Sequence, residues 1–147
     1  MIEINNRKAH FDYEILETYE TGIVLTGTEI KSVRQGNVNL KDSYAIIRNN
    51  EVFLLNMHIS EYKEGNIFNH DEKRTRKLLL HKKEILKIRD KVELEGITLV
   101  PLKLYFSKNK VKILLGIAKG KKTYDKRESI KKRDIEREIK MRMKNSY

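Results

Sequence analysis

Residues 97–118, ITLVPLKLYFSKNKVKILLGIA, decide the fold class of this chain of 147 residues. Ile97–Phe106 is rich in β-branched and aromatic residues, and Val111–Ala118 has the same strand-forming character. The polar residues Ser107–Lys110 between the two stretches predict a turn. Pro101, the single proline of the chain, cannot donate a hydrogen bond to a neighbouring strand, so it predicts an edge or a bulge. These residues indicate a protein built mainly from β-strands.

Shorter strands are expected on the N-terminal side, because turn-forming residues separate several short apolar runs there. The expected strands are Phe11–Tyr19, Ile23–Leu25, Tyr44–Arg48 and Val52–Met57. Gly22 is expected to break the chain between the first two, and Asn49-Asn50-Glu51 is a good hairpin connection between the last two.

Helices are predicted at two places. Residues 29–35 lie between two glycines, with Thr28 as the N-cap. Residues 82–94 carry apolar side chains at helical intervals, and Gly96 closes that helix. Six or so short strands with two or three short helices fit a small closed barrel of the OB type. Periodicity alone supports only a mainly β protein with helices.

The positive charge of the chain is concentrated near its C-terminus. The formal net charge is +11, which favours a polyanionic partner. Residues 119–147 hold 12 Lys and Arg against 5 Asp and Glu, whereas residues 1–118 hold 20 against 16. We therefore expect a folded domain over 1–118 and a basic tail over 119–147.

The basic tail has the pattern of an amphipathic helix. Asp125 to Glu128 has the spacing of a capping box, and apolar side chains recur at Ile135, Ile139 and Met143. Three apolar residues bury little area, so we expect a tail that is disordered in isolation and helical when bound. A helix lying on a membrane surface is an alternative, but it has no Trp or Phe to anchor it.

Several classes of protein are disfavoured. The absence of cysteine excludes disulfides and thiolate metal sites, and no segment has the pattern of a signal peptide or a membrane span, so a cytoplasmic protein is expected. No histidine pair has metal-ligand spacing, and no phosphate-binding loop is present. His70-Asp71 resembles a nuclease base only as a chance dipeptide would. We expect no cofactor, no metal and no enzymatic activity.

Residues 73–77 place four cations in five positions just before an apolar run. At alternate strand positions these side chains would form a ladder for phosphates, but an ordinary solvated charge run explains them equally well. Tyr13 and Tyr62 could stack on unpaired bases or could belong to the core.

The chain resembles the SmpB family, the protein partners of transfer-messenger RNA. The resemblance lies in short segments that cover nearly the whole chain and follow one another in the same order as in the family. The matching segments are Asn6-Arg7-Lys8-Ala9, Gly27-Thr28-Glu29-Ile30-Lys31-Ser32, Asp42-Ser43-Tyr44, Asn69-His70, Arg74-Thr75-Arg76-Lys77-Leu78-Leu79-Leu80-His81-Lys82, Thr98-Leu99-Val100-Pro101-Leu102, Leu104-Tyr105-Phe106, Gly120-Lys121-Lys122 and Tyr124-Asp125-Lys126-Arg127. The resemblance implies an OB-like barrel that holds the tRNA-like part of transfer-messenger RNA.

The resemblance also implies which residues bind RNA. Positions that match the family's RNA contacts are Asn6, Tyr13, Glu20, Leu79 and His81, and the expected set also includes the cations Arg7, Lys8, Arg34, Arg74, Arg76 and Lys77. Glu20 is an acid, and its carboxylate would accept from amino groups on bases. His81 is Asn in some members, and either side chain offers a hydrogen bond.

In the family the tail enters the ribosomal decoding site and lies as a helix in the empty messenger channel. The matching residues are the hinge Gly120, then Lys121, Lys122, Tyr124, Asp125, Lys126 and Arg127 for the decoding site, and Arg133, Arg137, Lys140, Met143 and Lys144 along the channel. The implied partners are transfer-messenger RNA, small-subunit ribosomal RNA and elongation factor Tu. The implied function is delivery of that RNA to stalled ribosomes.

Two other functions stay open on the sequence. A generic OB-type RNA-binding or ribosome-assembly factor would bind many RNAs with little preference and steep salt dependence. An RNA-processing enzyme is the third alternative, and dependence on a divalent metal would favour it.

Overall fold

The computed structural model describes residues 3–63, 69–94 and 96–121. The elements in this part of the chain are β1 (Glu3–Asn5), α1 (Arg7–Asp12), β2 (Tyr13–Ile23), α2 (Gly27–Arg34), β3 (Val38–Asn39), β4 (Tyr44–Arg48), β5 (Glu51–Leu55), β6 (His58–Ile59), β7 (Arg76–Leu79), α3 (Lys82–Val92), β8 (Ile97–Ser107) and β9 (Lys110–Gly120). The mainly β class predicted from the sequence is confirmed.

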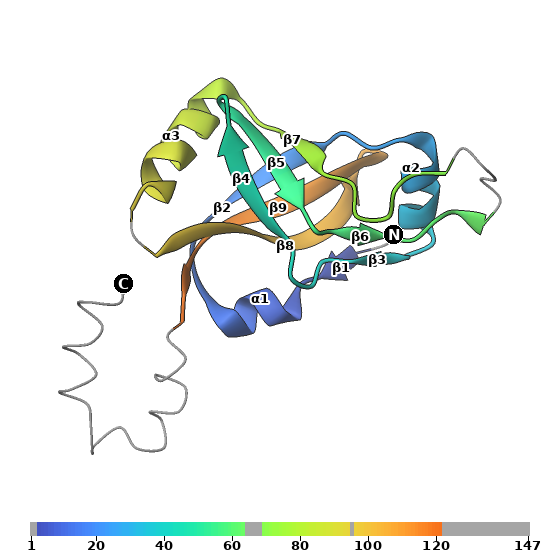
Figure 1. The fold of residues 1–147 in the computed structure, drawn as a ribbon, viewed down its shortest axis with the longest axis horizontal. Helices are drawn as coiled ribbons and strands as arrows, with labels where there is room; N and C mark the ends of the chain where they lie inside the picture. Colours follow the sequence, from blue (N-terminus) through green and yellow to red (C-terminus); the bar gives the residue numbers. More distant parts are fainter. Residues whose placement is uncertain (1–2, 64–68, 95, 122–147) are drawn as a thin grey trace, which may run out of the picture.

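The main sheet closes on itself. Its strand order is β1-β8-β4-β5-β7-β2-β9, and β9 also pairs with β8, so six strands form a ring to which β1 is added (Figure 1). The pairings of β9 with β2 and with β8 are long, whereas β4 joins β8 only through Ala45 and Leu99. A separate pair, β3 and β6, lies beside α2.

The β8–β9 hairpin confirms the strands, the turn and the bulge predicted at residues 97–118. Lys108 and Asn109 form the turn, and both have positive φ, the backbone shape that matches strand twist in a two-residue hairpin. The register shifts between Pro101 and Lys103. β8 nevertheless has partners on both sides, so of the two alternatives for the proline the bulge is correct.

The interior of the ring is one apolar cluster. Leu54, Leu104, Ile113 and Leu115 have no exposed surface, and they come from three different strands of the ring. Helices α2 and α3 pack at opposite ends of the ring and add Val33, Ile85 and Ile88 to the same cluster (Figure 1). A smaller cluster of Ala9, Val100, Leu102 and Ala118 packs α1 onto the outside.

The N-terminal part differs from the prediction. Residues 7–12 form helix α1, where a strand was predicted from Phe11, because the Asn6 side chain accepts from the Ala9 N–H and caps the helix. Gly22 does not break the chain but lies inside β2, opposite Leu79 of β7.

The helix boundaries also need correction. Thr26, not Thr28, is the N-cap of α2, and it forms a capping box with Glu29. Helix α3 ends at Val92, and Gly96, with φ +82°, lies in the turn before β8. β9 runs to Gly120, slightly past the predicted domain end at residue 118.

Candidate nucleic-acid interface

The basic run 73–77 does not form a phosphate ladder. Arg76 is fully buried, and its guanidinium donates to the Glu29 carboxylate at 2.7 Å and to the Met57 carbonyl at 2.7 Å. Arg74 donates to the same carboxylate at 2.7 Å and is about one-third exposed. Because β7 alternates its side chains, Arg76 points into the ring beside α2. The buried guanidinium offers no surface to RNA in this structure, and the expected contact of Arg76 with RNA stays a prediction.

Glu29 compensates these cations inside the fold. Burial favours its neutral form, but hydrogen bonds from Arg74, the Thr26 N–H and Arg76 outweigh burial and hold the pKa of the carboxyl below its usual value. Burial lowers the pKa of the Arg76 guanidinium, against the opposing effect of Glu29. The network ties α2 to β7 and positions the next residues of that strand.

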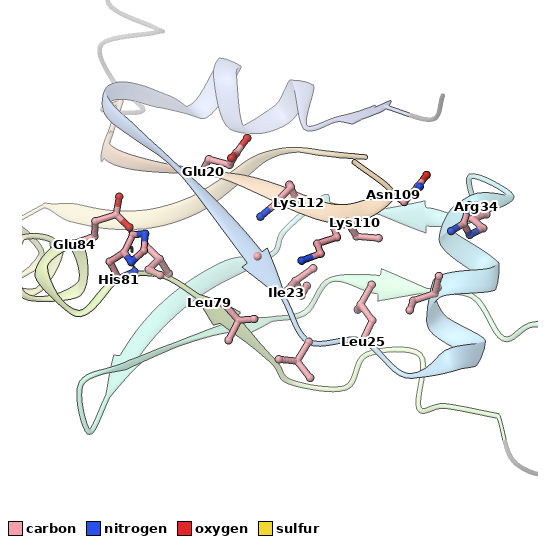
Figure 2. A pocket seen from close by; sticks show the side chains of 15 residues that line it. Glu20, Ile23, Leu25, Arg34, Leu79, His81, Glu84, Asn109, Lys110 and Lys112 are labelled. Carbon is pink, nitrogen blue, oxygen red and sulfur yellow. Dashed lines mark hydrogen bonds between the residues drawn. The ribbon is translucent and has the colours of Figure 1, made fainter. Parts of the chain in front are cut away.

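An open groove of about 740 Å³ lies along β2, β7 and β9 (Figure 2). Four of the expected RNA-binding residues line it: Glu20 from β2, Arg34 from α2, Leu79 from β7 and His81 at the start of α3. The Leu79 side chain is 50% exposed, which is unusual for a leucine next to a core. Gly22 provides the space beside it, since a Cβ there would lie 3.3 Å from the Leu79 Cβ.

The two ends of the groove differ in charge. Glu84 and His81 lie at one end in Figure 2, Arg34 lies at the other, and Lys110 and Lys112 lie between them. Arg34 also lies over the ring of Phe106, at 5.3 Å from its centroid. A carboxylate and an imidazole can bond base edges, and the cations can bind phosphates.

Lys110, Lys112 and Asn109 were missed in the sequence. The signal was present, because lysines alternate with buried Val111 and Ile113 along β9. Alternation in a half-buried strand places the polar set on the outer face. Which groove that face lines depends on the pairing of β9 with β2, which local sequence does not reveal.

A second group of expected residues lies around α1, away from the groove. Lys8 pairs with Asp42 at 2.9 Å, and Tyr13 lines the same small hollow of about 220 Å³. The hydrogen bond between Lys8 and Asp42 raises the pKa of the lysine and lowers that of the aspartate. Arg7 is exposed on α1.

Asn6 belongs to the scaffold of this region. It is 5% exposed, and its amide donates to the carbonyls of Leu40 at 3.2 Å and Pro101 at 2.8 Å while its oxygen caps α1. Both amide protons are used inside the protein. Asn6 therefore has no donor left for a ligand in this geometry, and its expected contact with RNA stays a prediction.

The remaining candidates separate into exposed and buried residues. Lys77 is partly exposed and pairs with Glu51. The Tyr62 ring lies under the Lys31 ammonium at 5.5 Å and is half-buried. His70 is buried, and its ring nitrogens lie 2.9 Å from the Thr28 hydroxyl and 2.8 Å from the Ile59 carbonyl, so the ring is a structural bridge.

The tail predictions fall mostly outside the described residues. Gly120 pairs with Tyr13 at the end of β9, and the Lys121 N–H donates to the Asp12 carbonyl. Lys122, Tyr124, Asp125, Lys126, Arg127, Arg133, Arg137, Lys140, Met143 and Lys144 lie outside the described residues.

In residues 3–63, 69–94 and 96–121, no three His, Asp or Glu side chains gather as a metal site would require. No helix in those ranges is long and apolar enough to cross a membrane.

Comparison with known proteins identifies the family. The family model described as SmpB protein matches residues 3–145. The chain belongs to the SmpB family. The SsrA-binding protein of Ligilactobacillus salivarius (strain UCC118) is 61% identical over 140 residues, covering 95% of this chain and 90% of that protein. The SsrA-binding protein of Carboxydothermus hydrogenoformans (strain ATCC BAA-161 / DSM 6008 / Z-2901) is 60% identical over 142 residues, covering 97% and 95%.

The SmpB fold is also shared with a solved structure. The chain matches one described as "tmRNA-SmpB: a journey to the center of the bacterial ribosome" with a TM-score of 0.73 and 48% identity, over 87% of this chain and 94% of that one. The SmpB family thus accounts for both the sequence and the ring of strands.

Proposed function

We propose that this chain binds the tRNA-like part of transfer-messenger RNA and delivers it to stalled ribosomes, as an adaptor and not as an enzyme. Membership of the SmpB family and identity of about 60% to SsrA-binding proteins over nearly the whole chain support this function. The observation that carries it is the groove, where Glu20, Leu79 and His81 come together from separate elements.

The groove has the chemistry of a site for an unpaired nucleotide. Leu79 offers an exposed apolar surface to a base, and Glu20 and His81 offer hydrogen bonds to base edges. Lys110 and Lys112 offer positive charge to the RNA phosphates beside that base. Base contacts give selectivity among RNAs, and phosphate contacts give affinity that falls with salt.

The tail supplies the second half of the proposed function. Residues 119–147 carry a net charge of +7, from 12 basic and 5 acidic residues, which suits ribosomal RNA at the decoding site and in the empty messenger channel. β9 ends at Gly120 on the α1 side of the ring, so the tail starts away from the groove. Elongation factor Tu would join the delivered complex.

The test is binding of the full chain to transfer-messenger RNA and to an equal excess of bulk tRNA at near-physiological salt. We expect strong preference for transfer-messenger RNA, which survives truncation after Lys121 while ribosome rescue is lost. Equal binding to both RNAs would reduce the protein to a generic RNA binder. A requirement for divalent metal in RNA cleavage would favour an enzyme.

A further inference from the structure

Glu20 has a partner that the proposed function does not use. The Tyr105 hydroxyl donates to Glu20 Oε2, across 85 residues of sequence. Glu20 lies on β2 opposite Leu114 of β9, and Lys103 of β8 is opposite the same leucine. Tyr105 therefore reaches over β9 from the second strand away, on the outer face of the sheet.

We propose that Tyr105 is a positioning residue that holds the Glu20 carboxylate in the orientation in which it accepts from an RNA base. The proposal rests on the proposed function, because it assigns a task to Tyr105 only if Glu20 contacts RNA. Tyr105 does not line the groove, so it would act on RNA binding only through Glu20, which does line it.

The physical reason is the conformational freedom of an exposed glutamate. Glu20 lies on the surface, and fixing such a side chain on binding costs rotamer entropy. A hydrogen bond already formed in the free protein fixes one carboxylate oxygen and leaves the other to accept from a base amino group. Binding then loses less entropy, so affinity rises without a new contact to RNA.

The protonation states suit this role. Burial, and then the hydrogen bond to Glu20 and its charge, raise the pKa of Tyr105 to about 12. At neutral pH the phenol therefore keeps its proton and donates, while the carboxylate accepts.

Tyr105 is itself held by neighbours on the outer face. The Lys103 ammonium lies 5.3 Å from the centroid of its ring, and it also lies 3.3 Å from a Glu3 carboxylate oxygen on β1. β1 pairs with β8 so that Glu3 is opposite Tyr105. The backbone of Tyr105 is thus held by a strand pairing, and its ring contacts a cation before RNA arrives, which suits a positioning residue.

The experiment uses the full chain with Tyr105→Phe, which removes the hydroxyl and keeps the ring. We expect roughly fivefold weaker binding to transfer-messenger RNA, the size that one hydrogen bond supports, with no large change in stability. Tyr19→Phe is the matched control, because the Tyr19 hydroxyl donates to Glu17 at 3.1 Å on the same strand but outside the groove. We expect that control to bind as the parent protein does.

A double-mutant cycle separates positioning from a general structural effect. In a Glu20→Gln background, Tyr105→Phe should cost little further affinity, because the carboxylate it positions is gone. Equal losses in both backgrounds would overturn the proposal. So would an unchanged affinity of Tyr105→Phe when Glu20→Gln alone weakens binding.

The contact is also tested without RNA. In NMR spectra of the protein with ring-labelled tyrosine, Glu20→Gln should move the Tyr105 resonance at neutral pH and leave that of Tyr19 in place. An unchanged Tyr105 resonance in Glu20→Gln would overturn the contact, whatever the RNA-binding result. Conversely, if the parent protein shows no preference for transfer-messenger RNA, the proposed function fails while the NMR result still reports whether Tyr105 holds Glu20.

Discussion

Arg76 and Glu29 form an ion pair inside the ring, with 2.7 Å between Arg76 Nε and Glu29 Oε2 and no exposed surface on either side chain. A buried pair of this kind adds little net stability relative to apolar residues, but loss of Glu29 would leave the Arg76 guanidinium buried without a carboxylate. The pair therefore makes Arg76 part of the scaffold, although it lies in a run of cations in which Lys73 is exposed and Arg74 and Lys77 are partly exposed.

Arg76→Met should destabilise the protein by about 1–3 kcal/mol, because the buried Met57 carbonyl loses its donor and Glu29 Oε2 keeps only the Arg74 Nε–H at 3.2 Å. Lys77→Met is the control, since its pair with Glu51 is about half exposed and contributes no more than ~1 kcal/mol. Urea unfolding of both variants measures the difference. A variant Arg76→Met that is as stable as the parent protein but weak in RNA binding would contradict the structural role.

The Glu29 carboxyl predicts a specific dependence of stability on pH. Its pKa in the folded state lies below the ordinary value of 4.5, so its stabilising effect is complete above that pH and is lost as the pH falls through the folded-state value. The stability gap between the parent protein and Glu29→Gln should therefore be large at pH 7 and should narrow below about pH 4.5.

Unfolding by urea at a series of pH values measures that gap. Glu14→Gln is the matched control, because Glu14 is exposed on β2, and its gap should be small throughout. A gap for Glu29→Gln that stays constant or widens toward acid would show that Glu29 is not ionised in the fold.

Gly22 and Leu79 predict how groove shape affects RNA binding. A Cβ at position 22 would lie 3.3 Å from the Leu79 Cβ, so Gly22→Ala should displace that leucine from its place in the groove. We expect about tenfold weaker binding to transfer-messenger RNA for Gly22→Ala and for Leu79→Ala, with small changes in stability.

Gly27→Ala is the control for that pair, because a Cβ at position 27 meets nothing within 4 Å. Filter binding at fixed salt measures all three variants. If Leu79→Ala and Gly27→Ala bind equally well, Leu79 does not contact the RNA.

Asn6→Asp should separate the two functions of the Asn6 side chain. The aspartate keeps the oxygen that caps α1, but it cannot donate to the Leu40 and Pro101 carbonyls. We expect thermal unfolding to show a free energy of unfolding lower by about 2–3 kcal/mol, since a buried carboxylate oxygen would lie against two carbonyl oxygens. Asn39→Asp, an exposed residue whose oxygen only accepts from the Lys41 N–H, should change stability little.

Local sequence predicted the elements whose causes are local. The turns predicted at Asn49-Asn50-Glu51 and Ser107–Lys110 are present, each narrowed to two residues of positive φ, and the bulge beside Pro101 follows from a missing N–H. Helix α1 was missed because six residues carry too weak a periodicity, and its cap depends on the Asn6 side chain that β8 and the Leu40 carbonyl also hold.

The candidate site was only partly predictable. The resemblance to the SmpB family singled out Glu20, Leu79 and His81, and the structure brings them to one groove. The resemblance also placed Asn6 on an RNA surface, and the basic run 73–77 placed Arg76 there, whereas the fold buries both side chains. The residue type shows which hydrogen bonds a side chain can form. The contacts of that side chain inside the fold decide whether any donor or acceptor is left for a ligand.

By itself the sequence determined that this protein is mainly β, that most of its net positive charge lies in residues 119–147, and that it resembles the SmpB family. Only the tertiary structure decided that Arg76 faces inward to Glu29, and that Tyr105 reaches Glu20 across β9. The physical reason is the range of the interactions. Turns, caps and strand propensities act over a few residues, whereas burial and side-chain pairing depend on strand registers set by residues far apart in the chain.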